Sequence, residues 1–420
     1  MQELYFLPLF LKTVSMKIFF RRIHLWLSLA AGIVILICCL TGALLVFQKE
    51  LEQAFHPERY FVVQGTQKLG ADQLIDAAKK SNKDAKINGI KIYTDPERSV
   101  EINISVVQEK PKGAAEKDKA ATKQSAAKPE SRPTSFTVFV NPYTAQVLET
   151  FNPREGFFFQ VMSLHRWLLG DSDGIGKTIT GVSTLIFLFI LITGIILWWP
   201  KTKNILIQRL KIKRNAGWKR FNHDLHMVLG FYSAIFLFIF SFTALAWSFE
   251  WFNEGIYTIT NSPLQPPPPP KSPYTENAKR ISYDEALKAA TTVLKDVQYY
   301  NISKPKDSVA AITITALGNN PLHESASDAV YIDQYSGKVL GTMLFSERSL
   351  GSQVRSTFRP VHVGSIYGTG SKTLAFIVCL FGVSFPITGV IMWINRLKKK
   401  KKAVAKPIIN TKKEALTTAV

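Results

Sequence analysis

Cysteine is scarce in this chain, and the few cysteines lie in apolar surroundings. Of 420 residues only three are cysteine, Cys38, Cys39 and Cys379, and each lies inside a run of apolar residues. We therefore expect neither a disulfide framework nor a thiolate metal site. The chain also lacks a Gly-x-Gly-x-x-Gly fingerprint and a Gly-x-x-x-x-Gly-Lys-Ser/Thr loop. Because these motifs hold nucleotide phosphates, their absence argues against NADPH or a nucleoside triphosphate bound here.

Charged residues are absent from the interior of four long apolar blocks. The blocks cover residues 21–47, 176–200, 221–247 and 371–395. Each is longer than the roughly 20 apolar residues needed to cross the hydrocarbon core of a bilayer. We therefore predict four membrane-spanning helices. The lack of a carboxylate or lysine within the spans argues against a proton-coupled transporter.

The blocks match one another in pairs. In the first and third, a histidine precedes a threonine by seventeen residues, and in the second and fourth, a lysine precedes a Thr-Gly pair by sixteen. The matching positions are His24 to Thr41 with His226 to Thr243, and Lys177 to Thr193 with Lys372 to Thr388. This register predicts a tandem duplication, each half consisting of a helix, an external domain and a second helix.

Basic residues predict the orientation of the spans. Eight of the 20 residues from 201 to 220 are Lys or Arg, with no acid among them, and the tail beyond residue 395 adds nine basic residues. Short basic loops remain in the cytosol, so both termini and the 201–220 loop are expected inside and the two long segments outside. This topology accounts for most of the net charge of +21. No basic stripe lies on a folded domain, so we expect membrane lipid as a partner and no nucleic acid.

The two long segments share a pattern of one helix and several strands. In the first, residues 71–80 have helical spacing and residues 87–93, 99–106 and 135–140 alternate as strands do. Residues 110–133 lack periodicity and are expected to be a disordered insertion. In the second, a proline-rich spacer precedes a helix from residue 283 to about 294, and residues 330–340 align with 138–148. We predict that each segment packs a helix on a small antiparallel sheet.

These observations divide the whole chain. The predicted segments are a cytosolic N-terminus 1–21, transmembrane helix 22–47, external domain 49–155, outer interfacial segment 156–176, transmembrane helix 177–200, basic cytosolic loop 201–220, transmembrane helix 221–249, Pro-rich linker 261–275, external domain 276–350, outer interfacial segment 351–371, transmembrane helix 372–395 and basic cytosolic tail 396–420.

Four histidines are candidate ligands because they recur at matching positions. His24 and His226 are expected near the cytosolic face, and His165 and His362 near the outer face. Seventeen helical residues rise about 25 Å, so the two faces hold separate sites. Haem suits such pairs, because an iron porphyrin that only passes electrons takes two axial imidazoles and no open position. The alternative is that each histidine only anchors its helix at the membrane interface.

Other residues are weaker candidates. His223 is an alternative ligand or a partner for a haem propionate, and Arg166 and Arg359 are propionate partners or plain interfacial anchors. His56 and His323 have no symmetrical counterpart and are expected to face solvent.

The chain resembles the PepSY-associated transmembrane family, in the "RRIHLW" and Thr-Gly spans from Met16 to Arg396 and in hairpins similar to those of PepSY domains. Two features depart from the pattern: Ala145 replaces the usual hairpin glycine, and the insertion has no counterpart in the second segment. The resemblance implies a bacterial inner-membrane protein with periplasmic PepSY-like domains and b-type haem, two haems if both pairs bind. No Cys-x-x-Cys-His motif for covalent attachment is present. The family resemblance also implies reduction of ferric siderophores or another ferric complex. Because no nucleotide-binding motif is present, the electrons are expected to come from quinol or a separate cytosolic reductase.

The fold class that follows is an α-helical membrane protein with four spans and two external α+β domains. Two other functions stay open. PepSY domains resemble modules that inhibit or chaperone peptidases, so the protein is alternatively a regulator that binds a partner without haem. A siderophore or metal permease is the third alternative, disfavoured by the uncharged spans.

Overall fold

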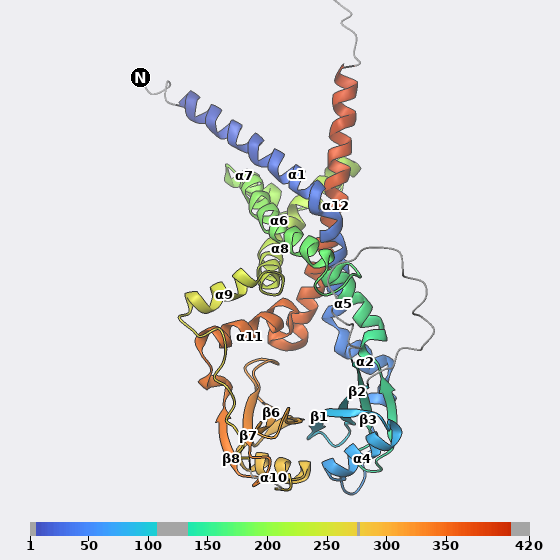
Figure 1. Ribbon diagram of the computed structural model, residues 1–420. Helices are drawn as coiled ribbons and strands as arrows, with labels where there is room; N and C mark the ends of the chain where they lie inside the picture. Colours follow the sequence, from blue (N-terminus) through green and yellow to red (C-terminus); the bar gives the residue numbers. More distant parts are fainter. Residues whose placement is uncertain (1–5, 107–132, 275–277, 405–420) are drawn as a thin grey trace, which may run out of the picture.

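Four long apolar helices form a bundle in the computed structural model, which describes residues 6–106, 133–274 and 278–404, with side chains for residues 16–399 of these (Figure 1). The helices are α1 (Phe6–Val46), α6 (Ile175–Trp198), α8 (Gly217–Ser248) and α12 (Gly368–Val404). Within the described chain these four have the length and hydropathy of membrane spans. The four predicted spans are therefore present as helices, and α1 and α12 extend beyond the predicted limits.

The bundle closes on itself through apolar packing. Helix α1 packs against α6 and α12, and α8 packs against the same two helices. Ala31, Ile35 and Cys39 of α1 meet Phe187 of α6 and Leu237 of α8 in its buried centre. Because lipid is as apolar as these side chains, close van der Waals packing holds such helices together.

Short helices surround the bundle and lead into the rest of the chain. Helix α5 (Phe157–Trp167) packs on α1 and α6, and α11 (Leu350–His362) packs on α8. The remaining short elements are α2 (Gln48–Phe55), α3 (Pro57–Tyr60), α7 (Lys203–Arg209), α9 (Glu250–Ile259), and the 3-10 turns η1 (Pro153–Glu155), η2 (Phe345–Glu347) and η3 (Ser365–Tyr367).

A single antiparallel sheet of eight strands lies at one end of the bundle (Figure 1). Its order is β4-β3-β2-β1-β5-β6-β7-β8. The strands are β1 (Lys86–Tyr93), β2 (Val100–Val106), β3 (Thr134–Val140), β4 (Val147–Phe151), β5 (Val297–Ser303), β6 (Ile312–Gly318), β7 (Asp328–Ile332) and β8 (Val339–Met343). The sequence pattern predicts a separate small sheet in each long segment, whereas the structure joins the two sets of strands where β1 pairs with β5, with Ile90 opposite Ile302.

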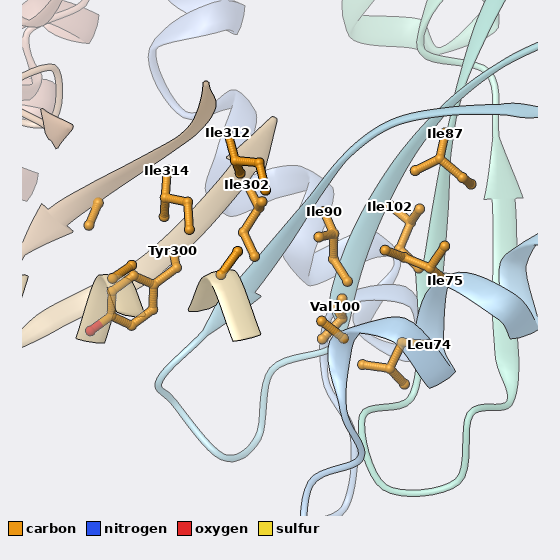
Figure 2. Packing of buried hydrophobic residues seen from close by; sticks show 14 of the residues in the cluster. Leu74, Ile75, Ile87, Ile90, Val100, Ile102, Tyr300, Ile302, Ile312 and Ile314 are labelled. Carbon is orange, nitrogen blue, oxygen red and sulfur yellow. The ribbon is translucent and has the colours of Figure 1, made fainter. Parts of the chain in front are cut away.

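Helices α4 (Ala71–Ser81) and α10 (Tyr283–Val293) cover one face of the sheet, the face directed away from the bundle (Figure 1). Alternate strand residues point to that face and form one continuous core with the helices. Figure 2 shows Ile90 and Ile302 beside each other in this core, between Leu74 and Tyr300. The core therefore crosses the β1–β5 junction without interruption.

The two covering helices cap each other. The Asp72 carboxylate accepts hydrogen bonds from the backbone N–H groups of Tyr283 (3.2 Å) and Asp284 (3.0 Å). In return the Asp284 carboxylate accepts from the N–H groups of Ala71 (2.6 Å) and Asp72 (3.3 Å). Each carboxylate thereby satisfies free N–H groups at a helix N-terminus and complements its positive dipole. This exchange holds the two parts of the sheet domain in a fixed relation.

The β-hairpins of the two parts differ at one backbone position. Ala145, between β3 and β4, has a φ of 57°, and Gly337, between β7 and β8, has a φ of 72°. Both lie in the left-handed region, which costs a residue with a Cβ about 1–2 kcal/mol. The departure noted in the sequence therefore places alanine where the backbone favours glycine. The predicted insertion 110–133 lies outside the described residues, apart from its last residue.

Candidate functional site

Two of the four candidate ligands lie on short helices and not on the spans themselves. His165 is near the end of α5, and His362 is the last residue of α11. Helix α5 stops because Leu168 and Leu169 take left-handed conformations, with φ of 52° and 64°, before the chain turns into α6. Packing of α5 on α1 and of α11 on α8 brings His165 and His362 against the bundle.

His165 and His362 face each other. Their ring centres are 6.3 Å apart and their planes are inclined at 64°. They line a cavity of about 270 Å³, whose walls include Cys38 and Gly42 of α1. Burial, together with the neighbouring His362, lowers the pKa of His165 to about 4. The ring is therefore neutral at physiological pH, which is the form that binds a metal.

His24 and His226 form the second predicted pair, and each lies seventeen residues before the threonine of its helix that contacts the first pair. The Cε1 atom of His24 lies against Gly194 of α6, and that of His226 lies against Gly389 of α12. A Cβ on Gly194 or Gly389 would stand 3.4 or 3.6 Å from the ring, in van der Waals contact, so a longer side chain has little room there.

Every one of the four rings is held by a threonine hydroxyl from a different helix. The Nδ1-to-Oγ1 distances are 3.0 Å for His24 and Thr193, 2.8 Å for His165 and Thr41, 2.8 Å for His226 and Thr388, and 3.2 Å for His362 and Thr243. In addition, His24 Nδ1 is 3.1 Å from the carbonyl oxygen of Ile190, and His362 Nδ1 is 2.9 Å from that of Phe240.

These contacts determine which ring nitrogen carries the proton. Each threonine hydroxyl donates its own hydrogen to the carbonyl four residues earlier in its helix, at 2.7–2.8 Å. Its oxygen is therefore left to accept, as is any carbonyl oxygen, so Nδ1 of the histidine is the donor. In the neutral ring Nε2 then keeps its lone pair. In all four histidines Nε2 is then the nitrogen without a hydrogen, which is the form of imidazole that can bind a metal, and the hydrogen bond at Nδ1 orients the ring.

Cationic side chains gather at the cavity between His165 and His362. Arg166, Lys177 and Arg359 all line it. The guanidinium of Arg166 lies 5.2 Å from the centre of the Trp167 ring, and Arg359 forms an ion pair of 2.8 Å with Glu324. The cavity thus has an apolar interior and basic groups in its wall.

The remaining histidines have other contacts. His223 contacts Asp224, with Nδ1 3.3 Å from the carboxylate, and its side chain is half exposed. His56 is exposed and lies 3.4 Å from Glu58. His323 was expected to face solvent, and that expectation is wrong: the residue is only 4% exposed and its ring packs edge-on against Phe345. His323 lies within the loop before β7, where its Nδ1 accepts a hydrogen bond from the backbone N–H of Ser325, a contact that the sequence pattern does not reveal.

The threonines are the residues that sequence reasoning did not assign. Thr41, Thr193, Thr243 and Thr388 served there only to mark the register of the repeat. The signal was present, because each threonine recurs at a fixed distance from a histidine or lysine. The sequence did not reveal which histidine each threonine contacts, because that histidine comes from another helix.

Comparison with known families agrees with this architecture, although no match is found among curated proteins. The family model described as the PepSY-associated TM region matches residues 21–396. That range begins just before His24 and ends just after the last apolar block, so it includes both histidine pairs and all four threonines. The chain is a member of the PepSY-associated transmembrane family.

Proposed function

We propose that this protein is an inner-membrane electron carrier that binds b-type haem at two histidine pairs and reduces ferric iron or a ferric siderophore at the outer face. The observation that carries the proposal is the shared geometry of the four histidines. Each is oriented through Nδ1 by a threonine, and each leaves Nε2 free.

The outer pair has the spacing that the proposal requires. Two imidazoles bound to opposite sides of one metal, each at about 2.0 Å, place their ring centres about 6 Å apart, and those of His165 and His362 are 6.3 Å apart. No group of three or more His, Cys, Asp or Glu side chains in the described residues is arranged to hold a bare metal ion. Two facing imidazoles suit a metal whose other ligands come from a macrocycle.

The protein's own residues define what happens at such a site. Haem bound there would supply one-electron transfer. The paired histidines would hold the iron, and the threonines keep the rings in a fixed orientation. Arg166 and Arg359 are placed to neutralise carboxylates at the cavity wall. The apolar lining from α1 and α8 excludes water and favours a site that only exchanges electrons.

Location and direction belong to the same proposal. The basic 201–220 loop favours an inside position for that end of the bundle, which places the sheet domain outside, in the periplasm. The recurrence of the same element order and the same His–Thr contacts in both halves supports a tandem duplication. The pair His24 and His226 would then lie on the side of the electron donor, quinol or a cytosolic reductase, and the pair His165 and His362 on the side of the electron acceptor.

At the outer face one electron converts Fe³⁺ in the complex to Fe²⁺. Chelators selective for Fe³⁺ hold the smaller charge of Fe²⁺ weakly, so iron is released. The basic side chains of Arg166, Lys177 and Arg359 favour the approach of an anionic ferric complex to the cavity.

The test is a reduced-minus-oxidised visible spectrum of the purified protein, with a haem assay per chain. We expect bands of low-spin six-coordinate b haem and about two haems per chain. The double variant His165→Ala and His362→Ala should retain one haem and lose ferric reduction in proteoliposomes with an internal donor. His56→Ala is the matched control, because His56 is exposed and contacts Glu58.

Three results would redirect the proposal. A colourless protein after expression with ample haem would favour a regulator that binds a partner. Iron uptake that persists without the histidines would favour a permease. Unchanged ferric reduction in the double variant would remove the outer pair from the path.

A further inference from the structure

A cleft of about 310 Å³ lies between the covering helices and the sheet, at one end of the β1–β5 junction. Four basic residues line it, two from each part of the sheet domain. Lys79 comes from α4 and Lys86 from β1, whereas Arg280 precedes α10 and Lys304 follows β5. The cleft is distinct from the cavity between His165 and His362 and contributes nothing to the electron path.

The described residues balance only part of the positive charge of this cleft. Lys79 forms an ion pair of 3.3 Å with Asp76. Among the residues that the structure describes, no carboxylate lies within ion-pair distance of Lys86, Arg280 or Lys304. The only acid in the cleft wall is Asp72, whose carboxylate already caps α10. Burial, Lys86, Arg280 and Lys79 together lower the pKa of Lys304.

A buried acceptor without a donor lies in the same wall. Gln334 is fully buried, and its Nε2 donates to the carbonyl oxygens of Asp307 (3.1 Å) and Ala310 (2.9 Å). Its Oε1 has no hydrogen-bond partner. Solvent does not reach this oxygen, so the cleft surface that a ligand would meet is formed mainly by the basic side chains.

We propose that this cleft binds a compact, soluble oxyanion that carries two or more negative charges, which meet Lys86, Arg280 and Lys304. Phosphate and polycarboxylates have this chemistry. Figure 1 shows α4 and α10 on the side of the sheet away from the bundle, so the ligand comes from solution and not from a lipid headgroup. Because both parts of the domain supply cations, the anion bridges the β1–β5 junction and stabilises it.

The experiment uses the full-length protein purified in detergent. Binding of inorganic phosphate and of citrate is measured by calorimetry, and thermal unfolding is followed at constant ionic strength with chloride as the reference. The test variant is Lys86→Gln with Lys304→Gln. The control is Lys80→Gln with Lys83→Gln, which removes the same charge from exposed lysines that do not line the cleft.

We expect phosphate or citrate to raise the unfolding temperature of the wild type and the control equally. The test variant should bind at least about tenfold more weakly, because charge-assisted hydrogen bonds are lost. Without anion it should unfold at the same or a higher temperature, since like charges are separated. If the double variant misfolds, anion binding is measured instead in Arg280→Gln, whose side chain is exposed. This variant should also bind the anion more weakly.

Two outcomes would overturn the proposal: no binding of either anion, or equal binding by wild type, test variant and control, which is the behaviour of an adventitious ion only. The visible spectrum is expected to be the same in all variants. The result therefore does not depend on whether the histidine pairs hold haem.

Discussion

Replacement of Thr388 by valine tests the role of the threonines most directly. Thr388 Oγ1 is the only hydrogen-bond partner that the structure shows for Nδ1 of His226, at 2.8 Å. Valine has nearly the same shape but no acceptor, so the Nδ1–H group is left unsatisfied next to the bundle. Such a loss costs about 1–3 kcal/mol, and every 1.4 kcal/mol is about tenfold in affinity. We expect haem affinity at this pair to fall by about 5- to 150-fold.

The matched control is Thr243→Val. His362 also loses a threonine there, but its Nδ1 still donates to the carbonyl oxygen of Phe240 at 2.9 Å. Its haem affinity should change by less than about threefold, since no N–H group is left without an acceptor. Thr388→Ser retains the hydroxyl and should restore the affinity lost in Thr388→Val.

Titration of haem-free protein with haem, followed by absorbance, measures these affinities for each variant. The midpoint potential is a second reading. Loss of the hydrogen bond makes the imidazole of His226 less basic, so it stabilises ferric iron less and the potential should rise. The measured quantities are the changes, relative to the wild type, in haem affinity and midpoint potential at the pair that each variant alters. Equal changes in Thr388→Val and Thr243→Val would refute the idea that the threonines orient the ligands.

Three further predictions concern the sheet domain. Asp72→Ala and Asp284→Ala should each lower the free energy of unfolding by about 1–2 kcal/mol in chemical denaturation, because each carboxylate caps the other helix; no change would mean that water replaces the caps. Ala145→Gly should raise stability by about 1 kcal/mol and Gly337→Ala should lower it, since both positions are left-handed, and the same sign for both would contradict this account. Burial lowers the pKa of His323, so the unfolded chain binds a proton at a higher pH than the folded protein does. The free energy of unfolding should therefore fall as the pH drops below about 6.5. In His323→Gln the free energy of unfolding should depend less on pH between pH 7 and 5.

The sequence predicted the parts of this protein that depend on local periodicity. Four uninterrupted apolar blocks were sufficient to predict four spanning helices, because a bilayer demands length and apolarity from each segment separately. Alternation of apolar and polar residues likewise predicted β1, β2 and β3, and helical spacing of apolar residues predicted α4. The register of His24 to Thr41 and of His226 to Thr243 marked the positions of the site before any geometry was known.

Tertiary structure decided which of these parts meet. The pairing of Ile90 with Ile302, the reciprocal caps of Asp72 and Asp284, and the contact of His226 with Thr388 all join residues far apart in the chain. No local pattern specifies such partners, because they depend on how helices cross and which strand edges are left to pair. The sequence by itself determined the elements and the repeated histidines. Only the packing of those elements determined that each histidine is oriented by a threonine and that one sheet unites the two segments.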